Sequence, residues 1–163
     1  MENVVVADPY SFAMSSALYA LAPRAKSRAE LFAHLVKRGV ESEIADNVLD
    51  DLELQGLLND LDFANIWSES RQRQKKLSKR VIAGELRGKG VSQDIIDEVV
   101  AKIDDTTEYQ TAFALAEKKF RSCAHLPEDK VYSRISGLLN RKGFSIALAS
   151  RIIRELLGKS PSN

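Results

Sequence analysis

The chain has 163 residues, of which 44% are hydrophobic and 29% are charged, and its formal net charge is +1. These values are typical of a soluble globular protein that is long enough to bury a core. No apolar run approaches the ~20 residues of a membrane-spanning helix, and the first eight residues lack the basic segment of a secretory signal. Cys123 is the only cysteine, which excludes an intrachain disulfide and favours a reducing, cytoplasmic environment.

Charge is unevenly distributed along the chain. Residues 41–62 include eight acidic residues and no basic one, whereas residues 71–90 include eight basic residues and a single acid, Glu85. Such an asymmetry predicts a surface with one strongly positive face.

Three glycines mark an internal threefold repeat. Gly39, Gly90 and Gly143 each follow basic residues and precede an apolar residue, and they are spaced 51 and 53 residues apart. Apolar residues recur in register on both sides of the glycines: Leu31, Ile82 and Ile135; Leu35, Leu86 and Leu139; Ile44, Ile95 and Leu148; Val48, Val99 and Ile152; Leu52, Ile103 and Leu156. A repeat usually builds a surface that binds a partner, not a single catalytic pocket.

The first repeat is expected to contain three helices. Pro23 ends the first, and Ser27 and Glu30 have the spacing of a capping box at the start of the second. Gly39 ends the second helix, because glycine adopts the left-handed conformation at little cost. The apolar positions that follow recur every four residues and predict the third helix.

The second and third repeats follow the same plan. Asp60 is a plausible N-cap for the first helix of the second repeat, and Ser78 for its second helix. In the third repeat, residues 107–110 have capping-box form, and Pro127 suits the first turn of the next helix. No segment shows the sustained alternation of a strand.

The sequence therefore predicts an all-α protein of three tandem three-helix repeats. Because a repeat of about fifty residues has only a thin core, the repeats should pack on one another in an elongated, curved array. We expect the repeats at residues 10–58, 59–104 and 105–158, preceded by an extension, residues 1–9, and followed by a frayed tail, residues 159–163.

Loose motifs recur in a fixed order over residues 10–157. In the first repeat they comprise Ala17, Leu21, Arg24, Ser27, Glu30, Leu31, Leu35 and Gly39. The segment 56–71, GLLNDLDFANIWSESR, contributes Asp60, Phe63, Ala64, Trp67 and Arg71. Later positions are Glu85-Leu86, Lys89-Gly90-Val91 and Arg141-Lys142-Gly143-Phe144. In this order and spacing the motifs resemble the RecX family, which regulates the bacterial recombinase RecA.

The resemblance implies three three-helix units, binding along the groove of the RecA nucleoprotein filament, and restraint of RecA's ATP hydrolysis and strand exchange in DNA repair and the SOS response. The chain departs from the family at Lys76, Leu77 and Ser78, where many members have glycines. This departure puts the conformation of that turn in doubt.

Basic residues are the candidates for contact with RecA or DNA. They are Arg71, Arg73, Lys75, Lys76, Lys79, Arg80, Arg87, Lys89, Lys118, Lys119, Arg141 and Lys142. Arg71 and Lys75 are spaced i, i+4, and such like-charge pairs cost a few tenths of a kcal/mol, which an anionic partner would offset. Alternatively, these cations lie in the last turns of helices and complement the helix dipole.

Nothing in the sequence points to catalysis or to a cofactor. Phe63 and Trp67, spaced i, i+4, are expected in the core instead of stacking on bases. His34, His125 and Cys123 have poor spacing for zinc, and no Walker-type phosphate loop is present.

We therefore expect a monomeric, non-enzymatic regulator of RecA filaments that does not bind membranes. Two alternatives stay open. One is a nonspecific single-stranded DNA-binding protein, although acids such as Glu43 and Asp94 after the glycine turns would repel phosphate. The other is a helical-repeat scaffold for a different protein, because repeats alone allow that role.

Overall fold

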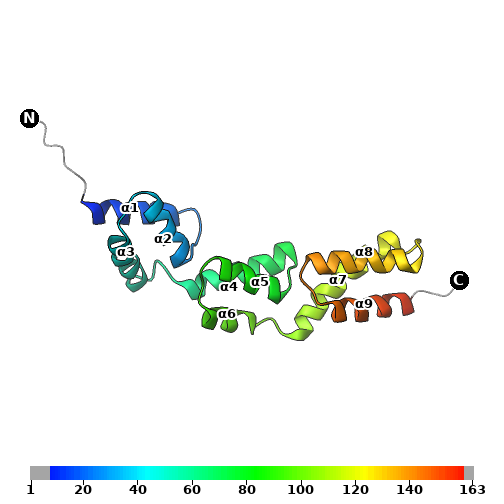
Figure 1. Ribbon diagram of the computed structural model, residues 1–163. Helices are drawn as coiled ribbons and strands as arrows, with labels where there is room; N and C mark the ends of the chain where they lie inside the picture. Colours follow the sequence, from blue (N-terminus) through cyan, green and yellow to red (C-terminus); the bar gives the residue numbers. More distant parts are fainter. Residues whose placement is uncertain (1–7, 160–163) are drawn as a thin grey trace, which may run out of the picture. The chain divides into compact units, whose positions relative to one another are not determined.

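Figure 1 shows the computed structural model, in which residues 8–159 are described. Within this range the chain forms nine α-helices and one short π-helical segment, and no residue of the range lies in a strand. The predicted all-α fold is therefore confirmed. Most of the expected N-terminal extension and of the frayed tail, residues 1–7 and 160–163, lies outside the described part.

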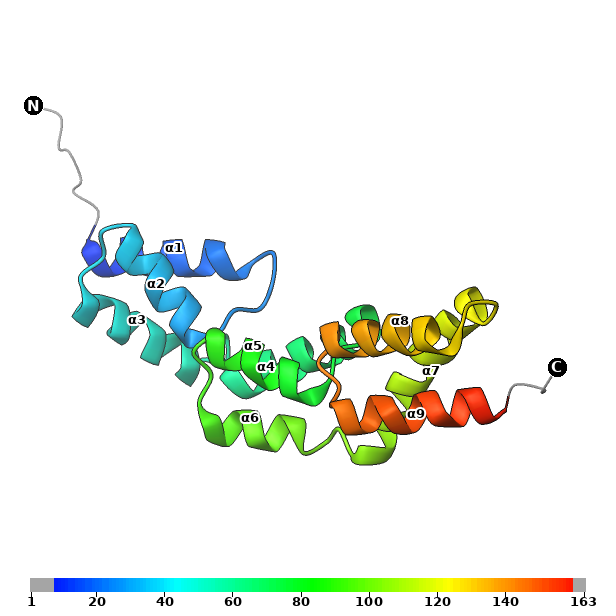
Figure 2. The ribbon, with the colours of Figure 1, turned by 45° about the vertical axis from the view of Figure 1, so that its right-hand side comes forward.

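The helices fall into three successive groups of three. The first group is α1 (Pro9–Leu21), α2 (Arg28–Lys37) and α3 (Ser42–Leu54). The second group is α4 (Asp60–Ser70), which continues into the π-helical segment (Arg71–Lys75), then α5 (Lys79–Gly88) and α6 (Gln93–Val100). The third group is α7 (Asp105–Cys123), α8 (Glu128–Arg141) and α9 (Ile146–Gly158). Within the first and third groups, all three helices pack on one another (Figure 2).

The helix boundaries follow from local sequence. Ser27 and Glu30 form the predicted capping box at the start of α2: the Glu30 amide donates to Ser27 Oγ, and the Ser27 amide donates to the Glu30 carboxylate. Gly39, Gly90 and Gly143 have φ angles of 86°, 74° and 92°. The expected left-handed turns after the second helix of each repeat are therefore confirmed.

Two predicted N-caps are wrong. Asn59, not Asp60, caps α4, because its side chain accepts the amide of Asp62. Helix α7 begins earlier than residues 107–110 suggested, because Asp104 accepts the amide of Thr107 and makes a better cap. In both cases a short polar residue just upstream takes the capping position.

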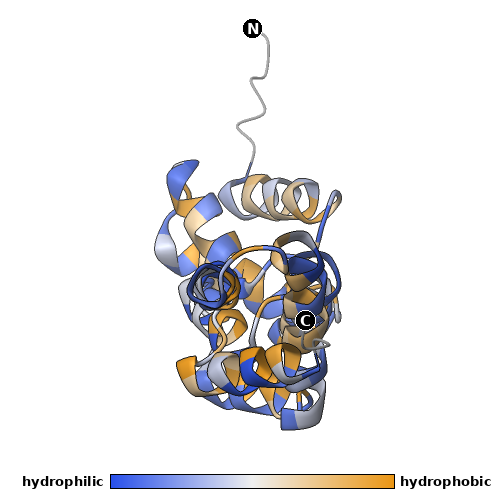
Figure 3. Ribbon diagram, turned by 90° about the vertical axis from the view of Figure 1, so that its right-hand side faces the viewer, coloured by the Kyte–Doolittle hydropathy of each residue, from blue (hydrophilic) through white to orange (hydrophobic). Residues whose placement is uncertain are grey.

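Apolar faces of the helices form the cores. In the first group, Leu31, Leu35 and Val48 are fully buried, and in the third group Ile135 and Ile152 are fully buried. Figure 3 shows hydrophobic and hydrophilic residues interspersed along the helices. The repeated apolar positions thus serve packing.

Phe63 and Trp67 lie largely in the core, as predicted. Phe63 is buried and stacks on the half-buried Trp67, with ring centroids 5.8 Å apart. Phe113 and Phe120 are partly buried against the core of the third group, in which Cys123 is fully buried.

The described residues divide into two compact units. One comprises the chain up to Trp67 together with Leu86–Ile96, and the other comprises Ser68–Glu85 together with the chain from Asp97 onward. In the first unit, the start of α2 contacts the second repeat. In the second unit, the start of α5 contacts the third repeat. No helix within residues 8–159 is long and apolar enough to cross a membrane.

Candidate functional site

The first compact unit contains a junction between the start of α2 and the second repeat, which we call the first junction. Ser27 is fully buried, and its Oγ donates to the carbonyl oxygen of Lys89 at 2.6 Å. The amide of Arg28 donates to Asp60 Oδ1 at 2.7 Å. A Cβ on Gly90 would overlap Ala29 Cβ, so the close approach requires glycine here.

Opposite charges are paired at the first junction. Lys89 Nζ lies 2.7 Å from Glu30 Oε1 and 5.0 Å from the centre of the Trp67 ring. Burial raises the pKa of Glu30, but the hydrogen bonds from Lys89 and from the Ser27 amide outweigh it, so that the pKa is lowered overall. The pair therefore stabilises this junction at neutral pH.

Arg28, on the same turn, is surrounded by acids of α3. Its guanidinium lies 2.9 Å from Asp50, 2.8 Å from Glu53 and 3.2 Å from Asp46. Burial lowers the pKa of Arg28, but the hydrogen bonds that its guanidinium donates to these carboxylates raise it overall. Acids of the stretch noticed in the sequence thus neutralise Arg28.

The second compact unit contains the corresponding second junction, between the start of α5 and the third repeat. The Ser78 amide donates to the Lys142 carbonyl at 3.0 Å, and the Lys79 amide donates to Glu108 Oε1 at 2.6 Å. A Cβ on Gly143 would overlap Val81 Cγ2. Both junctions therefore use a serine N-cap, a backbone carbonyl, an acid and a glycine.

The second junction differs from the first in its charges. The counterpart of Glu30 is Val81, so Lys142, the counterpart of Lys89, has no acid at that position. Instead, Lys142 Nζ donates to the carbonyl of Lys75 at 2.9 Å, and Arg80 Nε donates to the carbonyl of Gly143 at 3.3 Å. A backbone carbonyl accepts a hydrogen bond but does not neutralise a cation.

These contacts bring together Lys75, Arg80 and Lys142, which are distant in sequence. With the chain neighbours of Lys75 and Lys142 they make up what we call the basic cluster: Lys75, Lys76, Arg80, Arg141 and Lys142. All but the half-buried Lys142 are exposed. Sequence analysis nominated each of the five, but nothing local indicated that the π-helical segment and the end of α8 would meet.

Other predicted site residues are engaged within the protein. Arg71 Nε lies 2.9 Å from Glu85 Oε2, and Lys79 Nζ lies 2.9 Å from Asp105 Oδ1. The hydrogen bond that Lys79 Nζ donates to Asp105 raises the pKa of Lys79. Of the remaining candidates, Arg87 donates a hydrogen bond to Gln93. Arg73 is exposed on the π-helical segment. Lys118 and Lys119 lie on α7, a helix that contributes no residue to the basic cluster.

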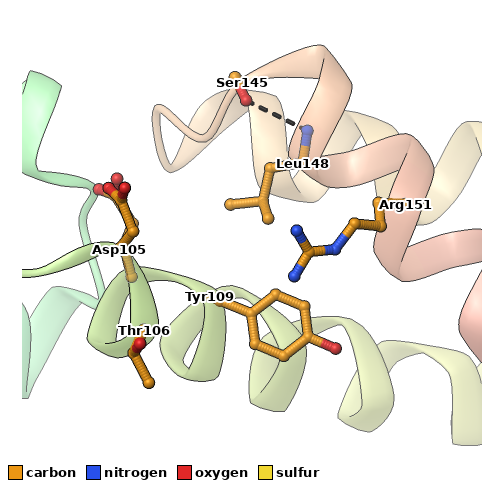
Figure 4. A pocket seen from close by; sticks show the side chains of 7 residues that line it. Asp105, Thr106, Tyr109, Ser145, Leu148 and Arg151 are labelled. Atoms are coloured by element: carbon orange, nitrogen blue, oxygen red, sulfur yellow. Dashed lines mark hydrogen bonds between the residues drawn. The ribbon is translucent and has the colours of Figure 1, made fainter.

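The third repeat also has a hollow of about 420 Å³ between α7 and α9 (Figure 4). Arg151 lies with its guanidinium carbon 4.6 Å from the centre of the Tyr109 ring, and the Tyr109 hydroxyl donates to Glu155. This hydrogen bond raises the pKa of Tyr109. Tyr10 and Asp51 repeat the same contact in the first repeat, so we interpret the tyrosine–carboxylate pair as part of the packing between first and third helices.

Within residues 8–159, no three potential ligands among His, Cys, Asp and Glu come together as a metal site. Four side-chain interactions at the junctions were not predicted from the sequence. They are those of Arg28 with the acids of α3, of Glu30 with Lys89, of Asp60 with the Arg28 amide and of Glu108 with the Lys79 amide. Only the register of the repeats could have suggested them, because Ser27 and Ser78 occupy equivalent positions.

Comparison with known proteins gives a consistent result. Models of the first, second and third three-helix domains of RecX match residues 13–52, 59–100 and 106–153. "Regulatory protein RecX" of Streptomyces coelicolor is 39% identical over 92% of this chain and 80% of its own length. The Mycobacterium avium protein of that name is 40% identical over 82% of this chain and 78% of its own.

The crystal structure of RecX from Lactobacillus salivarius has the same fold, with a TM-score of 0.83 over 93% of this chain and 98% of that chain at 24% identity. Three family domains in tandem and relatives of this identity leave one conclusion: the chain belongs to the RecX family of regulatory proteins.

Proposed function

We propose that this chain binds the RecA nucleoprotein filament and restrains its ATP hydrolysis and strand exchange, without being an enzyme itself. The relatives named regulatory protein RecX support the regulatory role. The binding role rests on the basic cluster, which supplies a concentrated positive charge on an exposed surface.

The contrast between the two junctions carries this proposal. At the first junction, Lys89 lies 2.7 Å from the Glu30 carboxylate. At the second, Lys79, the counterpart of Arg28, is again paired with an acid, Asp105, but Lys142, the counterpart of Lys89, donates to a backbone carbonyl, as does Arg80. Because close like charges repel one another, an anionic partner gains affinity there. Phosphates of the DNA in the filament or carboxylates of RecA have the required charge.

DNA-dependent ATP hydrolysis by RecA filaments tests the proposal, when it is titrated with this chain and compared with binding of the chain to bare single-stranded DNA at the same salt. We expect inhibition at concentrations well below those that saturate bare DNA. Inhibition that follows DNA coverage, with affinity falling at a slope near −0.7 per neutralised phosphate as salt rises, would indicate competition for the strand. No inhibition at all would contradict the proposal.

A further inference from the structure

The first repeat carries an uncovered counterpart of the two junction surfaces. At each junction the glycine turn is covered by the first turn of a preceding helix, through Ala29 on Gly90 and through Val81 on Gly143. At Gly39, no described atom lies within 4 Å of the position that a Cβ would occupy. Within residues 8–159, the same element therefore occurs three times, and a neighbouring helix covers it twice.

This surface is mostly apolar. We call it the open end, made of Pro9, Phe12, Gly39, Val40 and Ile44, which line a hollow of about 180 Å³ together with one acidic residue, Glu41. Phe12 is 40% exposed, although it sits beside the guanidinium of Arg38 at 5.5 Å. Terminal repeats that face only water usually present a polar outer surface, whereas an exposed apolar surface marks an interaction site.

The open end differs from its counterparts at one position. Asp60 and Glu108 accept the amides of Arg28 and Lys79 at the junctions. Aligned on the buried pairs Ala13/Ala17, Ala64/Ser68 and Ala112/Ala116, the equivalent residue of the first repeat is Pro9. At this position an occupant of the open end thus meets the Pro9 ring in place of a carboxylate, which favours an apolar side chain in its first turn.

A second copy of this chain does not supply that occupant through its own third repeat. Val131 takes the place of Ser27 and Ser78 there, and it is 1% exposed within the core of the third group. Helix α8 also begins at Glu128, four residues before the position equivalent to the starts of α2 and α5, so position 131 lies inside a helix and offers no free first turn.

We propose that the open end binds the first turn of a helix of RecA, one with a serine or threonine N-cap followed by an apolar residue. This inference rests on the proposed function. The hydroxyl of the N-cap would donate to the carbonyl of Arg38, as Ser27 Oγ does to the carbonyl of Lys89 at 2.6 Å. The apolar residue would cover Pro9 and Phe12.

Site-specific photo-crosslinking within RecA filaments tests this inference. A benzophenone amino acid would replace Phe12 in the open end, Lys76 in the basic cluster, or Tyr19, an aromatic residue of α1 that is 81% exposed. We expect position 12 to crosslink to RecA in the first turn of a helix, and position 19 to crosslink at least tenfold less. Phe12→Glu should weaken filament binding at least tenfold while leaving the helical circular dichroism unchanged.

Three results would overturn the inference. Crosslinks from position 76 without any from position 12 would leave the proposed function standing and remove the open end from it. Crosslinks from position 12 to residues 1–7 of the same chain, or to a part of RecA outside a helix start, would identify a different occupant. Filament binding by Phe12→Glu that is as tight as wild type would show that the open end does not contribute to binding. The absence of crosslinks from both positions 12 and 76 would contradict the proposed function itself.

Discussion

Lys76 has an unusual backbone conformation for its residue type. Its φ of 55° and ψ of 40° are left-handed, and it is the only residue other than glycine with a positive φ among residues 8–159. This conformation costs an L-residue about 1–2 kcal/mol. The turn at which the resemblance implied glycines thus keeps a glycine-like shape, and Lys76 gives the basic cluster a charge at the expense of stability.

Replacing Lys76 by glycine should therefore stabilise the protein. We expect Lys76→Gly to raise the free energy of unfolding by about 0.5–1 kcal/mol, because relief of the left-handed strain exceeds the added freedom of the unfolded chain. Urea unfolding measures this change in stability. The control is Lys75→Gly, within the π-helical segment, which should destabilise the protein by about 1 kcal/mol. Equal or lower stability of Lys76→Gly would refute the strain.

Glu30 should make the first junction sensitive to acid. Because its pKa in the folded protein is lowered, its contribution is fully present above the unfolded value of ~4.3 and is lost as the pH falls through the folded value. The free energy of unfolding of the wild type should exceed that of Glu30→Gln by roughly 1–2 kcal/mol at pH 7. The difference should shrink below pH ~4, and unfolding curves between pH 3 and 7 measure it. A difference that stays constant over this range would contradict the assignment.

At the scale of elements, the three glycine turns form a matched set. All three need a left-handed residue, but only Gly90 and Gly143 also face a neighbouring helix closely. Gly39→Ala should therefore cost about 1 kcal/mol through backbone strain alone. Gly90→Ala and Gly143→Ala should each cost about 1–3 kcal/mol more, because their Cβ atoms overlap Ala29 or Val81. Chemical unfolding of the three variants gives the comparison, and similar losses in all three would refute the close packing at the junctions.

Local sequence signals predicted most of the fold. The Ser27 capping box and the glycine turns depend on residues within four positions of one another, so the sequence alone sufficed. The caps at Asp60 and Thr107 were misplaced because Asn59 and Asp104, just upstream, compete for the same role. The residue that occupies the N-cap position depends on where the helix begins. A pattern of apolar residues locates the start of a helix only to within a few positions.

The candidate site was less predictable. Counting charges nominated Lys89 and Lys142 alike, yet Lys89 pairs with Glu30, 59 residues away, and Lys142 contacts the carbonyl of Lys75, 67 residues away. Such contacts depend on tertiary structure. The register of the repeats nevertheless held the relevant signal, because the substitution of Glu30 by Val81 in the second repeat removes the acid that would have neutralised Lys142.

At the scale of the whole molecule, equivalent positions have diverged toward different tasks. The first junction pairs its cations with acids, the second concentrates cations without an acid at position 81, and the open end of the first repeat has an apolar residue in place of an acid. The elongated, curved arrangement of the repeats stays a prediction, which small-angle X-ray scattering would test. Divergence among repeats is what allows a chain of similar units to bind a partner in a single register.

Binding to RecA filaments by a charge-reversed variant tests the central claim most directly. Lys75→Glu with Lys76→Glu changes the basic cluster, and Lys130→Glu with Arg134→Glu makes the same change in charge at exposed residues of α8. We predict at least tenfold weaker binding for the first variant, equivalent to ~1.4 kcal/mol, and near wild-type binding for the second. Equal effects of the two variants would mean that only net charge matters, and would contradict a specific role for the basic cluster.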